Sequence, residues 1–160
     1  MKLLKADKDR FQFQLDQKEK QLLFQVLGLY PLIPGSHQKL SKSETRPDDQ
    51  RLLEEALAAE RQRHKRQVDV MLRSKTLFIE REGGCEFALK PSQVEWLLQV
   101  LNDVRVGAWL ILGSPDGPAK TMAALNNKNA HYFWAMEAAA HFQMALVRAM
   151  TGGAEEAVQE

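Results

Sequence analysis

Two stretches of the chain share a pattern in which apolar residues at alternate positions lead through a helix cap to a pair of leucines. The first stretch contains Phe13, Leu15, Asp16, Glu19, Leu22 and Leu23, and the second contains Phe87, Leu89, Ser92, Glu95, Leu97 and Leu98. In each stretch the capping residue precedes a glutamate by three positions, which is the spacing of a capping box. The pattern predicts a strand followed by a helix at both places.

A hairpin is predicted between residues 77 and 89. Apolar residues at 77–79 and 85–89 flank Gly83 and Gly84, and paired glycines suit the positive φ angles of a two-residue turn. Such a turn would place two favourable pairs opposite each other, Arg81 with Glu86 and Phe78 with Leu89. Together with the strand at 11–15, the hairpin predicts a small sheet of about three short strands.

Helical periodicity predicts four main helices. They follow Asp16, begin at Pro47, extend from Ser92 to Leu112, and extend from about Asn129 to Thr151. Room remains for one short helix after Pro118, and the glycine pair at 152–153 is expected to end the last helix. The predicted fold is mainly α (α+β), with the four main helices packed as a bundle-like domain beside the small antiparallel sheet.

Length and polarity predict the domain organisation. A chain of 160 residues suits a single domain, so we expect one domain over 1–160. The polar residues at 35–46 exceed the usual length of a connection and predict a mobile loop. Residues 152–160 predict a frayed acidic tail.

Composition narrows the class of protein. The chain is 44% hydrophobic and 27% charged, with a net charge of +1, as in an ordinary soluble globular protein without a general attraction to nucleic acid or acidic membranes. The only cysteine, Cys85, cannot form an intramolecular disulfide. The N-terminus lacks the apolar core of a signal peptide and no stretch is long enough to span a membrane. We therefore expect a cytoplasmic protein without a membrane partner.

A basic cluster in the second helix is the first candidate site. Arg61, Arg63, Lys65 and Arg66 lie close together around His64 and could contact phosphates. Nucleic-acid binders usually add a second basic surface or aromatic stacking platforms, and neither is visible in the sequence. The same helix also carries glutamates. The cluster is therefore predicted to be a solvated, possible anion-binding face, and nucleic acid is not the expected partner.

The second candidate is the polar group Asn102, Asp103 and Arg105 in the third main helix. Asn102 and Arg105 share a face, whereas Asp103 points elsewhere. These residues could bind a carboxylate or a partner, or they could form an internal network that stabilises the fold. We favour the internal network, because a polar group beside leucines needs internal partners. Arg105 is then expected to be buried and paired with Glu137.

A metal site is the third candidate. Glu137 and His141 are four residues apart and reach one side of the last helix. Di-metal bundles use Glu-x-x-His on two helices with further glutamates, and that second set is missing here. A histidine hydrogen-bonded to a carboxylate is the simpler interpretation. We therefore predict no metal and no cofactor, and no catalytic role for Cys85.

Several of these residues also resemble a known family. The run 87–92, followed by Trp96 and by Asn102, Asp103 and Arg105, resembles the most recognisable segment of the bacterial domain-of-unknown-function family numbered two thousand and seventeen. Its members have a tryptophan before an Asn-Asp-x-Arg core and a terminal helix with an aromatic pair, which corresponds here to 131–134. The stretch 13–19 resembles the family's opening strand and helix, whereas the basic helix and the Gly83-Gly84 hairpin depart from it.

The resemblance implies a small helical cytoplasmic protein without an established activity, labelled a regulator in some members and often encoded near components of Clp-type proteolysis. We therefore expect a non-catalytic protein-interaction or regulatory module whose partner is another protein. A nucleic-acid-binding transcriptional regulator acting through the basic helix is the first alternative, and a metal-dependent enzyme with ligands on the last helix is the second. The oligomeric state stays open, a homodimer included.

Overall fold

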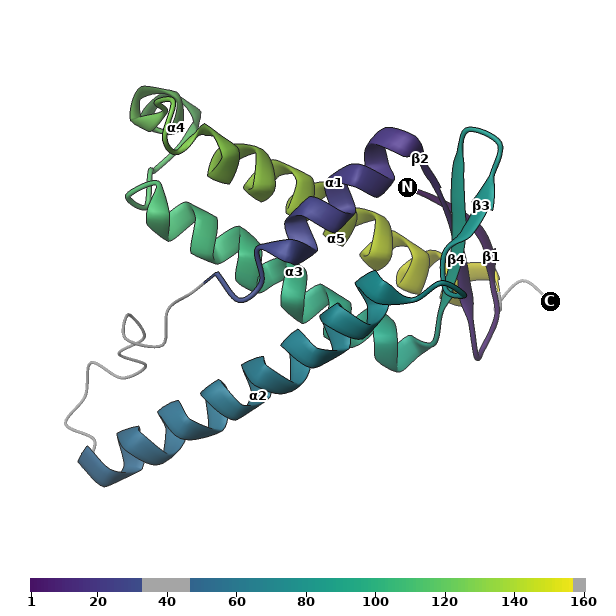
Figure 1. Cartoon of the computed structure of the whole chain (residues 1–160), viewed down its shortest axis with the longest axis horizontal. Helices are drawn as coiled ribbons and strands as arrows, with labels where there is room; N and C mark the ends of the chain where they lie inside the picture. The colour runs from purple at the N-terminus through teal and green to yellow at the C-terminus, as the bar shows by residue number, and fades with distance from the viewer. Residues whose placement is uncertain (33–46, 157–160) are drawn as a thin grey trace.

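The computed structural model describes residues 1–32 and 47–156, which form a mainly helical fold with a small antiparallel sheet (Figure 1). Their strands and helices are β1 (Lys2–Ala6), β2 (Phe11–Asp16), α1 (Gln17–Gly28), α2 (Pro47–Arg73), β3 (Ile79–Arg81), β4 (Gly84–Leu89), α3 (Pro91–Ile111), α4 (Pro118–Ala124) and α5 (Ala130–Glu156). The predicted fold class is confirmed in outline. The predicted counts are too low, because β1 adds a strand and α4 occupies the place where one short helix had room. The predicted mobile loop (35–46) lies outside the described residues, as do residues 157–160 of the predicted tail.

Strand β1 was missed because its sequence does not alternate. Leu3 is half-buried, whereas the next residue, Leu4, is exposed. The pairing of β1 with β2 shifts register between Leu3 and Lys5, as at a β-bulge. A bulge inserts an extra residue and breaks the two-residue period by which strands are recognised in a sequence.

The sheet has the order β1-β2-β4-β3, so two strands far apart in the sequence form its centre. Phe13 of β2 lies opposite Phe87 of β4, and their rings stack with centroids 5.5 Å apart. Both side chains are fully buried. The two stretches that share a sequence pattern therefore pair with each other and form the apolar centre of the sheet.

The hairpin between β3 and β4 differs from the prediction by a shift in register. Arg81 lies opposite Gly84, so the two-residue loop is Glu82-Gly83. Gly83 has a φ of 78°, which the loop requires of it. A Cβ on Gly84 would lie 1.9 Å from the backbone oxygen of Leu15, so this glycine is required by the close approach of β2.

The predicted cross-strand pairs change accordingly. Arg81 still contacts Glu86, with Nε 3.4 Å from Oε2, but across the diagonal of the hairpin. Phe78 does not lie opposite Leu89, because regular pairing of β3 begins only at Ile79. Its buried ring contacts Phe87 instead, with centroids 5.2 Å apart. A turn placed one residue away is enough to move every pair in a hairpin.

The two predicted helix caps have different outcomes. The first is confirmed, since Asp16 Oδ1 accepts from the Glu19 N–H at 2.8 Å and Glu19 Oε2 accepts from the Asp16 N–H at 3.1 Å. The second is wrong, because α3 begins at Pro91 and Ser92 already lies in its first turn. Gln93 Oε1 accepts from the Lys90 N–H at 2.8 Å. Proline has a backbone suited to the first helical position, so the helix begins earlier than the serine.

Helices α3 and α5 pack antiparallel along their length, with the sheet at one end of the pair and α4 at the other (Figure 1). Helix α3 buries leucines and valines, and α5 buries alanines together with Phe142. The alanines allow the two helices to approach closely. Helix α1 crosses this pair. Helix α5 continues through the glycines at 152–153 to Glu156, so the prediction that they end the helix is wrong. Glycine weakens a helix by about 1 kcal/mol but does not prevent one.

Helix α2 extends away from this body over much of its length (Figure 1). Among its described side chains, only His64, Val68 and Met71 are buried, all in its second half. Within the described part of the chain, no helix is both long enough and apolar enough to cross a membrane.

Candidate functional site

The predicted basic cluster of α2 does not act as one patch, because Arg61 turns inward. Arg61 Nε lies 3.6 Å from Asp103 Oδ2, and these two side chains are only 15% and 14% exposed. The other oxygen of Asp103 accepts a hydrogen bond of 3.2 Å from the Leu32 N–H. This group connects α2 to α3 and to the chain that leaves α1, so Arg61 has a structural role.

Tyr30 and His64 lie beside this ion pair, with ring centroids 6.5 Å apart. Tyr30 is 3% exposed, and its burial, together with the nearby carboxylate of Asp103, raises the pKa of its hydroxyl to about 12. His64 is also buried, and its Nε2 lies 3.9 Å from Glu60 Oε1. A polar layer therefore separates the packed end of α2 from its projecting half.

The Asn102, Asp103 and Arg105 group was predicted with the wrong residue inside. Asp103 makes the internal contacts, whereas Asn102 and Arg105 are exposed on α3. An Arg105 guanidinium nitrogen lies 3.4 Å from Asn102 Oδ1. Glu137 is exposed too, and the described residues show no ion pair between it and Arg105. Asp103 could have been identified from the helical period, because it lies one turn from the buried Val100 and one turn from the buried Gly107.

The other basic side chains of the cluster lie on the outside of α2. Lys65 pairs with Asp69 at 3.0 Å, and a guanidinium nitrogen of Arg63 lies 4.0 Å from Glu60. Both pairs are exposed i,i+4 or i,i+3 contacts, which contribute about 0.2–1 kcal/mol at most. Arg66 is exposed, and within the described residues it forms no ion pair.

A groove of about 900 Å³ opens where the packed end of α2 meets the start of α3 and the end of β4. Its basic side chains are Arg10, Arg63, His64 and Arg66. Its apolar side chains are Val70, Met71, Leu77, Leu89 and Trp96. Within the described residues, no aspartate or glutamate lines it. The groove therefore combines arginine side chains with an apolar floor.

The sequence contains a signal for this groove that the basic cluster alone does not show. Arg63, Arg66 and Val70 follow one another at spacings of three and four, so they share one face of α2, and Ser74 follows directly after the helix. Val70 is 70% exposed, which shows that this face is not part of the core. Arg10 and Trp96 join it only through the fold, Arg10 from the turn between β1 and β2 and Trp96 from the start of α3.

A second exposed apolar surface lies at the α4 end of the molecule. Trp134 is 64% exposed, Met122 62% and Trp109 40%. Trp109 Nε1 donates to the backbone oxygen of Pro115, which holds the loop after α3. The groove combines charge with concavity, so we take it as the candidate site for selective recognition.

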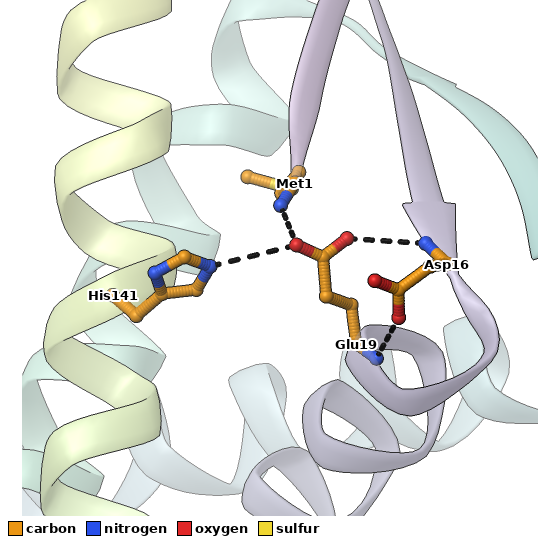
Figure 2. A network of polar contacts seen from close by, with 4 residues as sticks. All are labelled: Met1, Asp16, Glu19 and His141. Carbon is orange, nitrogen blue, oxygen red and sulfur yellow. Dashed lines mark hydrogen bonds and ion pairs between the residues drawn. The ribbon is translucent and has the colours of Figure 1, made fainter.

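The predicted metal residues Glu137 and His141 do not pair with each other: His141 pairs with Glu19 instead. His141 Nε2 lies 3.7 Å from Glu19 Oε1, which also pairs with the Met1 ammonium group (Figure 2). The partner of His141 is therefore a carboxylate of α1, bound in turn to the cap at Asp16. Among the described residues, no group of three histidine, cysteine or acidic side chains is arranged to hold a metal.

Cys85 lies at the centre of the sheet and is fully buried. Burial raises the pKa of its thiol, which disfavours the reactive thiolate. Comparisons of the chain with protein-family models, with curated proteins and with solved structures found no match.

Proposed function

We propose that this chain is a non-catalytic protein-interaction module that recognises its partner through the groove between α2 and α3. The observation that carries the proposal is the groove itself, with its arginines and an apolar floor that includes the exposed Val70. Arginine and tryptophan are enriched among the residues that contribute most to protein interfaces. The groove belongs to packed helices and a strand, so a partner would meet a preformed surface.

The chemistry of the groove supports binding rather than catalysis. His64 is its titratable side chain of ordinary catalytic type, and this ring is mostly buried against Tyr30 and Glu60. A general base must lie within hydrogen-bond distance of the substrate proton that it removes. Exposed guanidinium groups and apolar side chains instead provide charge and contact area.

A nucleic-acid-binding regulator stays the first alternative, because Arg63 and Arg66 of the basic helix do line the groove. Arg61 and Lys65 are committed to Asp103 and Asp69, which removes half of the predicted phosphate-binding set. No observation favours a metal-dependent enzyme. The proposal also includes a cytoplasmic, regulatory role associated with Clp-type proteolysis. This part is based on the resemblance to the bacterial family alone.

The test is partner capture by crosslinking from a native cell lysate, with the full chain as bait. Wild type is compared with a groove variant, Arg66→Glu with Val70→Asp, and with Arg51→Glu, which places the same charge change on α2 outside the groove. We expect a defined set of proteins to be captured by wild type and Arg51→Glu and lost by the groove variant. Equal capture by all three would contradict the proposal. Thermal unfolding of each bait checks that it is folded.

A further inference from the structure

Two arginines of the groove have no competing ion pair among the described residues, and the third has a long one. Within the described residues Arg10 and Arg66 form no ion pair, and Arg63 reaches Glu60 only at 4.0 Å. Guanidinium groups bind carboxylates through two parallel hydrogen bonds, which makes arginine well suited to acidic ligands.

The apolar floor adds a second requirement. Val70 is 70% exposed and Trp96 is half-buried, and both line the same groove as Arg66. An inorganic anion would leave this surface in water, whereas a ligand with a large apolar side chain would bury it. Burial of apolar surface contributes about 25 cal/mol per Å² before the costs of association.

The positions of the cations favour a chain-like ligand. Arg10 comes from the loop after β1, whereas Arg63 and Arg66 lie on successive turns of α2. Charges on separate elements match carboxylates spaced along a peptide better than they match one compact anion.

The surroundings limit the length of such a ligand. Glu60 lies beside Arg63 on α2. The hollow next to Arg10 holds charges of both signs, Asp7 and Asp9 with Lys8 and Lys90. A long polyanion such as nucleic acid would meet Glu60 where it ran along α2 past Arg63, and its phosphates would be repelled there. A short acidic segment can end before Glu60.

We infer that the groove binds a short acidic peptide segment of a partner protein, with its carboxylates on Arg63 and Arg66 and a large apolar side chain between Val70 and Trp96. This inference rests on the proposed function, because it names the chemistry of the partner at the same site. Charge complementarity identifies the occupant, and the apolar floor selects among acidic segments.

Fluorescence anisotropy tests it, with the full chain and a short fluorescein-labelled peptide in which glutamate and leucine alternate. We expect binding by wild type and by Arg51→Glu, and at least about tenfold weaker binding by Arg63→Glu combined with Arg66→Glu. A glutamine–leucine peptide should bind wild type at least about tenfold more weakly than the glutamate–leucine peptide does, because it carries no carboxylates. A lysine–leucine peptide should bind the double variant better than it binds wild type.

Three results would overturn the inference. They are failure of wild type to bind the glutamate–leucine peptide, equal binding by wild type and the double variant, and tighter binding of a short single-stranded DNA than of the peptide. If the groove variant still loses its cellular partner after such a result, the interaction module stands and only the acidic ligand is wrong. If capture is also unchanged, the proposed function fails as well.

Discussion

Helices α2 and α3 are both long, yet they use their residues in opposite ways. Helix α3 buries side chains on every turn from Val94 to Ala108, mainly against α5 and also against α1 and β4. Helix α2 buries only His64, Val68 and Met71 among its described side chains, and Leu52 and Leu53 near its start are 59% and 47% exposed. One helix holds the fold together, and the other is attached to it near one end.

This difference explains where a recognition surface can form. A fully packed helix such as α3 has few side chains to spare, and its sequence is constrained by the core. A helix attached by an ion pair and three buried residues keeps its remaining face free for charge and exposed apolar groups. The groove is lined by both helices. Helix α3 provides a side that is fixed by the core, and α2 provides a side whose sequence the core does not constrain.

The largest expected effect comes from the same truncation made in each helix. Leu97 of α3 is 1% exposed, so Leu97→Ala should lower the free energy of unfolding by about 2–5 kcal/mol through lost burial and a cavity. Leu53→Ala removes the same atoms from a side chain that is 47% exposed and should change it by at most about 0.5 kcal/mol. Urea unfolding measures both. Similar losses for the two variants would show that α2 packs as tightly as α3.

The attachment of α2 is tested at Asp103. Asp103→Asn removes the charge that pairs with Arg61 and should lower the free energy of unfolding by about 1.5–3 kcal/mol, the range for hydrogen bonds to charged groups. Asp69→Asn is the matched control, because its exposed pair with Lys65 should contribute only about 0.2–1 kcal/mol. Equal effects in thermal or urea unfolding would mean that the Arg61–Asp103 pair does not fasten the two helices.

Much of the fold can be predicted from local pattern, and the failures have definite causes. The strands at Phe13 and Phe87 and the cap at Asp16 follow from alternation and spacing that involve neighbouring residues only. Strand β1 and the hairpin register depend on a bulge and on the approach of Leu15 to Gly84. Those are contacts between segments far apart in the chain, which no local period encodes.

The candidate site was predicted less well for the same reason. The basic cluster was recognised, but the inward turn of Arg61 depends on Asp103, a residue of another helix. The pairing of His141 with Glu19 likewise joins the two ends of the chain. The groove forms only when the fold brings Arg10, α2 and Trp96 together. The sequence alone can therefore identify at most the α2 face of the groove.

The polar layer at the junction predicts a dependence on pH. Burial, and then Asp103, raises the pKa of Tyr30 from its ordinary value of 10.0 to about 12. The folded protein therefore keeps this proton to higher pH than the unfolded chain, and stability present below pH 10 is lost as the pH rises toward 12. The loss should be on the order of 1 kcal/mol per pH unit in that window.

Tyr30→Phe is the control for this titration, because it keeps the ring and removes the hydroxyl. Urea unfolding at several pH values should show a shallower decline between pH 10 and pH 12 for the variant than for wild type. Identical declines would mean that other groups, and not Tyr30, govern stability at high pH.

The smallest effect is expected at Arg105, and it sharpens the comparison most. Arg105 is on α3 but on its exposed side, where its guanidinium group donates a hydrogen bond to Asn102 and forms no ion pair among the described residues. Arg105→Ala should therefore change the free energy of unfolding by at most about 0.5 kcal/mol, as at an ordinary surface position. Thermal and urea unfolding measure it against Asp103→Asn, two positions away on the inner side. A loss as large as that of Asp103→Asn would show that Arg105 has an internal partner. The outer face of α3 would then help to stabilise the fold, whereas the free face of α2 is available for binding.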